Sequence, residues 1–268
     1  MSHTADVIII GGGVQGASLA FHLAQRGVKV IVLEKKFVAA GATGRSSGLV
    51  RMHYDTEVDS RLAWESFTYF RNWKELVGGE SGFTRTGFIQ IVEAKHEDAL
   101  KANVAMHQRI GIPSFVITAD DVKRLAPSFA TDDFKLAAYE PESGYAMPSD
   151  TANALMSAAS ARGVRLVQDC AVTAIKVAGG KVVAVETTQG EFSAPVIVNA
   201  AGAWANQINK MVGLDLAYDT WRHDTMFVAR PSQIGVSHPT VIDFSKEMYF
   251  RPEGELTLVG LEDGNPLG

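Results

Sequence analysis

The chain has 268 residues, 46% of them hydrophobic, and a formal net charge of −5. This length supports one large domain or two smaller ones, each with its own core. The charge balance excludes nucleic-acid and anionic-membrane surfaces, which need a basic patch, and the single cysteine excludes a disulfide framework and a multi-cysteine metal site. No apolar run approaches the roughly 20 residues that cross a bilayer, and the N-terminal residues lack a signal-peptide pattern, so we expect a cytoplasmic protein without a membrane span.

The N-terminal residues have the pattern of a βαβ unit. Residues 6–10 form a continuous apolar run, as buried parallel strands do. A helix is predicted over residues 14–26, ended by Gly27, and a second buried strand over residues 28–33. The strand, helix and strand together predict one parallel pair with its crossover helix.

A glycine pattern joins the first strand to the helix. Residues 11–16, Gly-Gly-Gly-Val-Gln-Gly, match the G-x-G-x-x-G pattern of dinucleotide-binding proteins. Gly11 permits a tight turn, Gly13 lets backbone N–H groups approach a pyrophosphate, and Gly16 lets the helix pack closely on the strand. The helix N-terminus adds partial positive charge for the phosphates.

Glu34 follows the second strand, where a carboxylate can accept hydrogen bonds from a ribose 2′-hydroxyl. The same carboxylate would repel a 2′-phosphate, which disfavours NADP despite the neighbouring Lys35 and Lys36. NAD and FAD both carry an adenosine ribose, so both remain open on these residues.

The rest of the chain mixes helical and strand patterns. We expect a loop over residues 35–56, an amphipathic helix over 58–77, and a helix over 97–110. Asp150 is expected to cap a further helix that ends near 161. Strands are predicted at residues 83–92, 164–167, 171–177, 181–187, 195–199, 226–228 and 255–259. This mixture indicates an α/β core with a more β-rich second part.

Two further segments are similar to a known family. Residues 41–51, Gly-Ala-Thr-Gly-Arg-Ser-Ser-Gly-Leu-Val-Arg, look like the flavin-contacting loop of the D-amino-acid oxidase-like FAD-dependent oxidoreductase superfamily. Their G-x-T-G-R form resembles the branch of the sarcosine oxidase β-subunit and proline dehydrogenase. Residues 196–204 resemble the same family's second dinucleotide-side strand and turn, and residues 249–252 resemble its substrate-domain strands. The resemblance covers essentially the whole chain.

The resemblance implies an α/β fold of two domains. A Rossmann-like FAD-binding domain is expected at residues 1–85 and 146–212, and a discontinuous, β-rich substrate domain at residues 86–145 and 213–268. Family members usually continue beyond this endpoint and return to the FAD domain over the flavin ring. We therefore expect the substrate domain to be C-terminally incomplete, with weakened FAD retention and little turnover for this chain alone. A partner subunit or a homo-oligomer is one way to complete the site.

The resemblance also implies FAD as the cofactor, and it assigns site residues. The implied cofactor-binding residues are Gly11, Gly13, Gly16, Glu34, Lys35, Thr43, Arg45, Ser46, Val172, Ala201 and Gly202. Among them, Val172 is expected to read adenine through its backbone amide. Arg51 matches the position that clamps the substrate carboxylate, for which a guanidinium offers two parallel donors. Tyr249 matches a tyrosine that supports the same carboxylate, although a half-buried strand tyrosine is an equal alternative.

The implied activity is oxidation of the C–N bond of a secondary or N-methylated amino acid, sarcosine-like or proline-like, by hydride transfer to flavin N5. No catalytic triad or metal is expected, because the cofactor carries the chemistry. Since only a neutral amine donates hydride, we expect an alkaline pH optimum. The alternatives are an NAD-dependent dehydrogenase and a catalytically silent dinucleotide-binding fragment or subunit.

Overall fold

The computed structural model describes residues 3–235, 237–261 and 265–266. It divides into two compact units, each built from three segments of the chain. Unit 1 comprises Met1–Ser46, Trp73–Gly82 and Met147–Thr220, and unit 2 comprises Ser47–Asn72, Phe83–Ala146 and Trp221–Gly268. The chain end at Gly268, on which the expectation of an incomplete domain depends, lies outside the described residues.

The units differ from the expected domain limits chiefly in residues 47–72, which group with unit 2 rather than with the glycine-rich unit. The reason is local pairing. Strand β3 (Leu49–Val50) pairs with β8 (Gly144–Tyr145), and helix α2 (Glu57–Arg71) contacts α4 (Glu97–Arg109). The assignment of the cofactor to one unit and the substrate to the other is a proposal, argued below.

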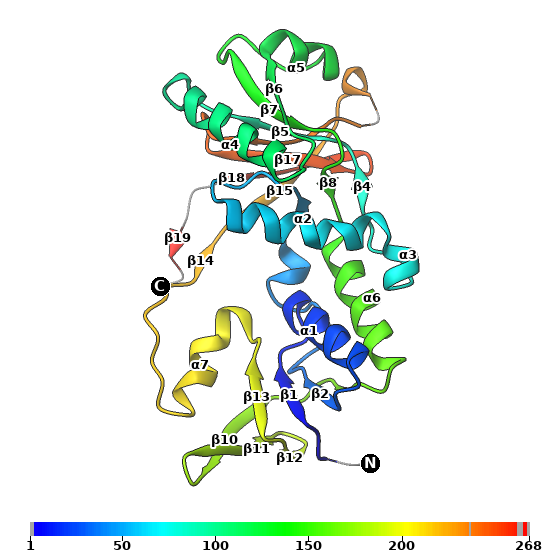
Figure 1. Ribbon diagram of the computed structural model, residues 1–268, viewed down its shortest axis with the longest axis vertical. Coiled ribbons are helices and arrows are strands. Elements are labelled where there is room, and N and C mark those ends of the chain that lie inside the picture. Colours follow the sequence, from blue (N-terminus) through cyan, green and yellow to red (C-terminus); the bar gives the residue numbers. More distant parts are fainter. Residues whose placement is uncertain (1–2, 236, 262–264, 267–268) are drawn as a thin grey trace. The chain divides into compact units, whose positions relative to one another are not determined.

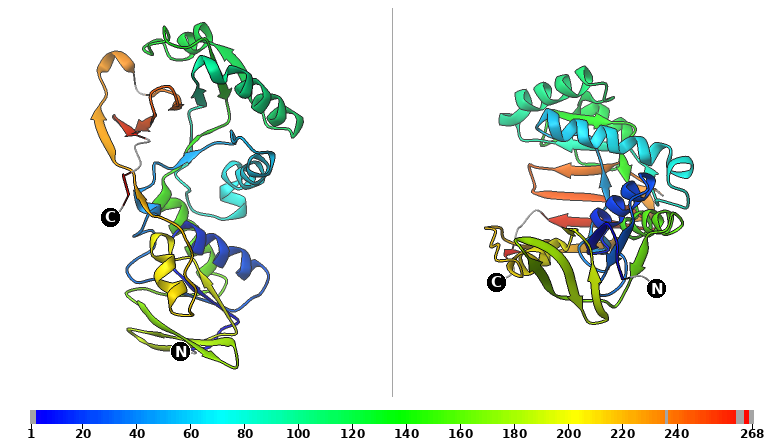
Figure 2. Two further views of the ribbon diagram at one scale, coloured as in Figure 1. Left: turned by 90° about the vertical axis from the view of Figure 1, so that its left-hand side faces the viewer. Right: turned by 60° about the horizontal axis from the view of Figure 1, so that its bottom comes forward.

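A four-stranded parallel sheet forms the centre of unit 1 (Figure 1). Its order is β13 (Val196–Asn199), β1 (Val7–Ile10), β2 (Val30–Leu33) and β9 (Arg165–Val167). Helix α1 (Val14–Gln25) connects β1 to β2 and packs against α6 (Pro148–Ser160), and the two helices lie side by side in Figures 1 and 2. This arrangement confirms the predicted Rossmann-like βαβ unit.

An antiparallel sheet packs on the parallel sheet. It consists of β10 (Val172–Ala178), β11 (Lys181–Thr187) and β12 (Gly190–Ser193). Val185 and Phe192 from this sheet share one hydrophobic core with Ile8, Ile10 and Leu33. Alternate side chains of a strand point to opposite faces, and Ile9 accordingly faces α1, near Gly16. Unit 1 is therefore built in three layers: helices, parallel sheet and antiparallel sheet.

Short elements complete unit 1. They are η1 (Thr43–Arg45), α3 (Trp73–Leu76), η3 (Gly202–Trp204) and α7 (Ala205–Lys210). Two sequence expectations were wrong here. The helix expected over residues 58–77 is two helices, because α2 ends at its C-cap Asn72. Asp150 does not cap α6: the helix begins at Pro148, which is favoured in the first turn because proline has no N–H to satisfy.

Unit 2 contains a seven-stranded mixed sheet in the order β15-β18-β17-β16-β5-β7-β6 (Figure 1). The strands are β5 (Phe88–Ile91), β6 (Phe115–Thr118), β7 (Leu136–Glu140), β15 (Thr225–Ala229), β16 (Thr240–Asp243), β17 (Met248–Glu253) and β18 (Leu256–Leu261). On one face Ile89 and Val241 pack with Val122 of α5 (Ala119–Leu125). Elsewhere Ala138 packs with Leu100 of α4.

Smaller elements border that sheet. Strands β3, β8 and β4 (Thr84–Arg85) form a three-stranded sheet, and β14 (Trp221–Arg222) pairs with β19 (Asn265–Pro266). The single-turn helices are η2 (Ala94–His96) and η4 (Ser232–Ile234). Helix α5 was not expected from the sequence, yet Thr118 and Asp121 form a capping box at its start.

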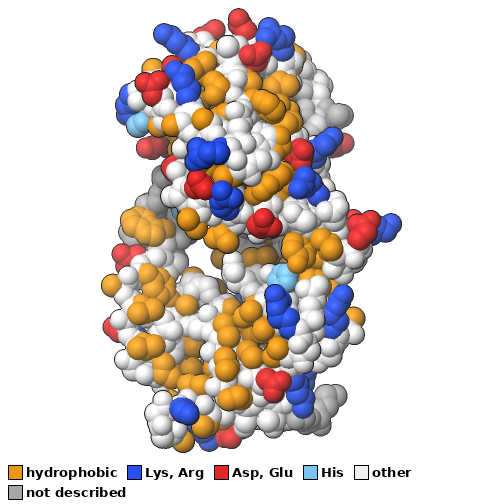
Figure 3. All heavy atoms as spheres, in the orientation of Figure 1, with side chains coloured by type: hydrophobic (Ala, Val, Ile, Leu, Met, Phe, Trp, Pro, Cys, Tyr) orange, Lys and Arg blue, Asp and Glu red, His pale blue; other side chains and the backbone are white. Residues whose placement is uncertain are grey.

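The surface agrees with the charge balance of the sequence. On the face that Figure 3 draws, lysine and arginine side chains stand among acidic ones, so the described residues show no basic patch there. Within the described part of the chain, every helix is too short or too polar to cross a lipid bilayer.

Candidate functional site

The carboxyl ends of the parallel strands bring four loops of unit 1 to one edge of the sheet. These loops follow β1, β2, β9 and β13, and backbone hydrogen bonds join them. The N–H of Gly11 donates to Leu33 O, that of Ala200 donates to Ile10 O, and that of Cys170 donates to Glu34 O, each at 2.9 Å. In open parallel sheets ligands bind at this edge, in the crevice at the point where the strand order reverses.

Close approaches surround the three glycines of the pattern. Gly11 has φ +112°, and a Cβ atom there would lie 2.4 Å from Ala200 O. A Cβ on Gly16 would lie 2.0 Å from Gly11 O, because α1 begins directly against the turn. A Cβ on Gly13 would lie 3.0 Å from Thr43 Oγ1. A larger residue at Gly11 or Gly16 would move the backbone of this turn, whereas one at Gly13 would press on the Thr43 side chain.

The N-terminus of α1 presents unpaired donors at this edge. The N–H of Val14 donates to Thr43 Oγ1 at 3.0 Å. Those of Gln15 and Gly16 reach no protein acceptor among the described residues. Free N–H groups and the helix dipole together make a site for an anionic group. The glycine turn and these donors therefore fit the pyrophosphate of a dinucleotide.

Glu34 is buried at the end of β2, and its carboxylate is fixed by two backbone groups. Oε2 accepts from the N–H of Gly12 at 2.7 Å, and Oε1 accepts from the N–H of Lys36 at 2.8 Å. Each carboxylate oxygen can accept more than one hydrogen bond, so the group can still receive a ribose hydroxyl. Its position fits the role predicted for it.

Lys35 reaches the loop that follows β13. Its Nζ lies 3.5 Å from the ring centroid of Trp204 in η3, a cation–π contact. Partial burial lowers the pKa of the Lys35 ammonium. The contact with Trp204 was not foreseen, because no fixed spacing in the sequence joins residues so far apart.

The remaining predicted cofactor residues lie in unit 1 with different surroundings. Arg45 is exposed. Its Nη1 donates to Ala40 O at 3.0 Å and to Gly41 O at 3.1 Å, and these bonds stabilise the loop that contains it. Ser46 is exposed at the end of η1. Val172 begins β10, opposite Thr187.

Ala201 and Gly202 follow β13. The N–H of Ala201 donates to Asn199 Oδ1 at 3.2 Å. Gly202 has φ +54°, and a Cβ there would have no atom within 4 Å, so its backbone faces open space. Accessible backbone of this kind suits a loop that lies against a ligand.

Arg51 lies in unit 2, directly after β3, and is half-buried. Its guanidinium carbon lies 4.2 Å from the ring centroid of Tyr54 and 5.8 Å from that of Phe88. Among the residues that the structure describes, no carboxylate forms an ion pair with this guanidinium. A partly buried arginine beside two aromatic rings, without an ion-pair partner among the described residues, has donors that an external carboxylate could accept.

Tyr249 also lies in unit 2, in β17, and is buried. It shares a core with Phe88, Ile242 and Leu258. Its ring covers Gly260 of β18, where a Cβ would lie 2.1 Å from Tyr249 Cζ. Arg51 and Tyr249 thus both border Phe88, although Tyr249 is packed more deeply than a residue of a substrate pocket needs to be.

Two buried charged side chains of unit 2 were not identified from the sequence. Glu140, buried at the end of β7, accepts from the N–H of Met52 at 3.0 Å and from Ser143 Oγ at 2.7 Å. It thereby fixes the backbone next to Arg51. Burial raises the pKa of Glu140. An acidic residue inside the apolar segment 136–140 was the one signal that could have found it.

Arg251 is the second. It is 2% exposed, pairs with Glu253, and lies over the ring of Tyr145 at 4.3 Å. Its Nη1 donates to Pro252 O at 2.8 Å and its Nε donates to Ser47 O. With its donors satisfied internally, Arg251 connects β17 to the β3-β8-β4 sheet, in contrast to Arg51.

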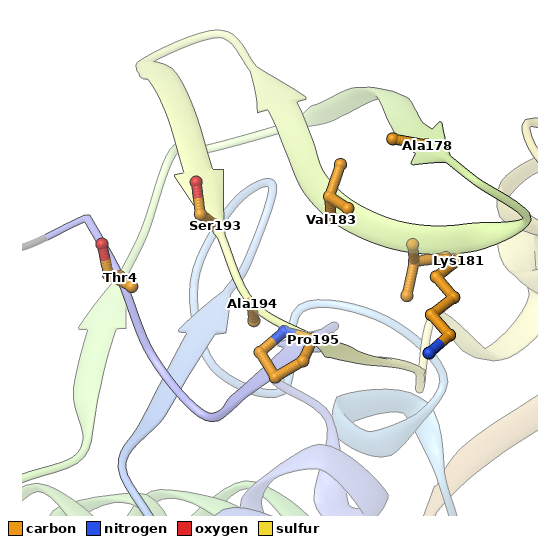
Figure 4. A pocket seen from close by; sticks show the side chains of 8 residues that line it. Thr4, Ala178, Lys181, Val183, Ser193, Ala194 and Pro195 are labelled. Carbon is orange, nitrogen blue, oxygen red and sulfur yellow. The ribbon is translucent and has the colours of Figure 1, made fainter.

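A surface pocket of about 560 Å³ lies elsewhere in unit 1 (Figure 4). It is lined by Thr4, Ala178, Lys181, Val182, Val183, Ser193, Ala194 and Pro195. Thr4 precedes β1 and Pro195 precedes β13, so the pocket is at the amino edge of the parallel sheet. It is therefore separate from the glycine turn, which lies at the carboxyl edge.

Comparisons with known proteins agree with this geometry. The chain is 30% identical to mouse (Mus musculus) mitochondrial sarcosine dehydrogenase over 98% of its own length and 30% of that protein. It is 30% identical to the mouse mitochondrial pyruvate dehydrogenase phosphatase regulatory subunit over 92% of its length and 29% of that protein. The chain thus spans about 30% of the length of these curated relatives.

Among solved structures, L-proline dehydrogenase from P. horikoshii matches with a TM-score of 0.90 and 26% identity, over 97% of this chain and 70% of that one. The sequence profile of the DAO family, described as FAD dependent oxidoreductase, matches residues 6–266. The match confirms the predicted α/β fold and decides between the two dinucleotides in favour of FAD, so the NAD alternative is not retained. The chain belongs to the DAO family of FAD-dependent oxidoreductases.

Proposed function

We propose that this chain carries the FAD-binding and substrate-binding parts of an enzyme that oxidises the C–N bond of a secondary or N-methylated amino acid. The observation that carries the proposal is Arg51, a half-buried guanidinium between Tyr54 and Phe88 without a carboxylate partner among the described residues. An amino acid brings the carboxylate that such a group lacks. The names of the relatives, sarcosine dehydrogenase and proline dehydrogenase, support amino acids of this kind.

We assign FAD to unit 1. Gly11, Gly13 and Gly16 would form the turn around the pyrophosphate, and the N-terminus of α1 would donate to it. Glu34 would accept a ribose hydroxyl. The other predicted contacts, from Lys35, Thr43, Arg45, Ser46, Val172, Ala201 and Gly202, belong to the same proposal. When bound, FAD supplies the two-electron acceptor of the oxidation.

The residues of unit 2 would bind and orient the substrate. Arg51 would hold the carboxylate through two parallel N–H donors, which fixes the direction of the adjacent C–N bond. The rings of Tyr54 and Phe88 would exclude water from this ion pair and so strengthen it. Tyr249 would support the carboxylate. No side chain is required as a base, because the substrate amine reacts in its neutral form, which favours alkaline pH.

A panel of amino acids tests this function. The protein, loaded with FAD, is mixed without oxygen with sarcosine, dimethylglycine, proline or glycine, and loss of the oxidised-flavin absorbance is followed. We expect at least one secondary or N-methylated amino acid to reduce the flavin, and methylamine, which has no carboxylate, to react far more slowly. Equal reaction of methylamine would refute the role of Arg51, and reduction by none would refute amine oxidation by this chain on its own.

A second candidate is a catalytically silent subunit that binds FAD without reducing it. The relative named pyruvate dehydrogenase phosphatase regulatory subunit supports it. Retained FAD without reduction by any amine would favour this candidate. A partner subunit or a second copy of the chain, and a cytoplasmic location, remain predictions from the sequence.

A further inference from the structure

Three buried titratable side chains of unit 2 converge outside the proposed cofactor and substrate residues. His53 follows Arg51 by two positions, His107 lies in α4, and Glu140 ends β7. Their exposed fractions are 1%, 0% and 0%. One nitrogen or oxygen atom of each lies within 4.8 Å of the corresponding atoms of the other two. Three segments far apart in the sequence thus bring two imidazoles and a carboxylate to one point.

The polar atoms at this point lack hydrogen-bond partners. Neither ring nitrogen of His53 has one, and the same holds for Nδ1 of His107 and Oε1 of Glu140. Leaving buried polar groups unpaired destabilises a fold, so native structures nearly always satisfy them. A cluster of four such atoms calls for a bound species that pairs with all three side chains.

The hydrogen bond of His107 leaves its other ring nitrogen free for a cation. His107 Nε2 lies 3.1 Å from the carbonyl oxygen of Tyr54, which can only accept, so Nε2 carries the proton and Nδ1 offers a lone pair to the cluster. A neutral imidazole with a free ring nitrogen is the form that binds metals.

We propose that His53, His107 and Glu140 form a binding site for a first-row divalent metal ion, with zinc the ion that best matches two imidazoles and one carboxylate. Bonds to zinc of about 2.0–2.2 Å place ligand atoms roughly 3.4 Å apart, so atoms within 4.8 Å need only small side-chain rotations to close on the ion. A bound ion would keep Glu140 ionised, and this carboxylate would then offset the nearby guanidinium of Arg51, which otherwise opposes a cation.

The role that follows is structural. The ion would join the segment after β3, helix α4 and strand β7. Because its three ligands are at most 1% exposed, water rather than substrate would fill the fourth coordination position. Glu140 already accepts from the N–H of Met52 through Oε2, so its free Oε1 can bind the ion without losing that contact. This inference does not depend on the proposed amine oxidation.

Zinc binding to the full chain tests it. Protein dialysed against EDTA is titrated with zinc chloride by calorimetry, and its thermal unfolding is followed with and without the metal. We expect one zinc per chain and a rise in Tm of several degrees. His107→Gln and His53→Ala each weaken binding by about 100-fold or more, since loss of even an outer-shell partner costs 10–100-fold. His96→Ala, at an exposed histidine of the same unit, leaves it unchanged.

Absence of binding to the wild-type chain would overturn the proposal, as would equal binding to His107→Gln. Should the variants not fold, wild-type protein loaded with zinc or cobalt(II) decides by X-ray absorption. Two imidazole ligands support the site, and a spectrum without imidazole ligands overturns it. A crystal structure with an ordered water at this point in excess zinc would also overturn it.

Discussion

Thr43 Oγ1 accepts the first N–H group of α1, that of Val14, at 3.0 Å. A residue of the loop after β2 therefore caps the helix that begins after β1. The bond holds that loop close to the glycine turn: a Cβ on Gly13 would lie 3.0 Å from the same oxygen. Loop and helix form one rigid edge around the proposed pyrophosphate site.

Thr43→Val should lower the free energy of unfolding by about 1 kcal/mol, because valine keeps the shape but removes the acceptor of a backbone N–H. Urea unfolding of the FAD-free protein measures the change. Thr43→Ser retains the hydroxyl and is the control. An unchanged urea midpoint for Thr43→Val would show that water satisfies Val14 equally well.

Gly16→Ala should abolish FAD retention. The new Cβ would lie 2.0 Å from Gly11 O, so α1 must move away from β1 and the glycine turn opens. Overpacking of this kind costs about 1–3 kcal/mol or more. Bound flavin is measured by absorbance after gel filtration. Gln25→Ala, at the exposed C-terminal end of α1, serves as the control. Retention of FAD by Gly16→Ala would contradict the assignment of this turn.

Arg51→Ala should weaken substrate binding by about 100-fold or more, as expected when one partner of a desolvated ion pair is removed. Arg51→Lys should fall between this variant and the wild type, because lysine keeps the charge without the two parallel donors. The dependence of anaerobic flavin reduction on substrate concentration separates binding from the rate at saturation. Arg109→Lys, at an exposed arginine paired with Glu57, is the control. A wild-type KM in Arg51→Ala would refute the clamp.

His238 should make unit 2 less stable in mild acid. Its Nδ1 lies 2.8 Å from Pro239 O and its Nε2 lies 3.0 Å from Thr257 Oγ1. Burial lowers the pKa of His238, an effect that the charge of Arg230 reinforces and the bond to Pro239 opposes. The unfolded chain therefore binds more protons between the folded pKa and about 6.5, so stability is complete above that pH and falls as the pH drops through this window.

Urea unfolding at pH 7.5 and 5.5 tests this. His238→Asn should lose less stability than the wild type over this range, the difference being at most about 1.4 kcal/mol per pH unit. His96→Asn, at an exposed site, should behave as the wild type. Identical pH dependence of wild type and His238→Asn would contradict the contribution of His238.

The sequence predicted unit 1 better than unit 2. Spacing along a short segment locates Gly11, Gly13, Gly16 and Glu34, since strand, turn, helix and strand follow one another and need no distant partner. Resemblance added Arg51. The contact of Lys35 with Trp204 and the bond of Glu140 to Met52 were missed because each joins residues brought together only by strand order.

The predicted ends of two helices were wrong where local sequence signals compete. Asp150 is a good capping residue, but Pro148 before it already suits the first helical turn. The apolar periodicity continues across Asn72, yet the two helices it separates belong to different units. Apolar periodicity indicates which residues of a helix are buried, but it does not indicate which of the two units they pack against.

The chain passes between the two units five times, after Ser46, Asn72, Gly82, Ala146 and Thr220. Neither unit is therefore a continuous stretch that a ribosome could complete before starting the other. Each must wait for segments synthesised later, and its contacts are separated by long loops whose closure slows folding. A single peptide-bond cut at one crossing would leave four other connections intact. We therefore expect the two units to fold together and to resist proteolysis together.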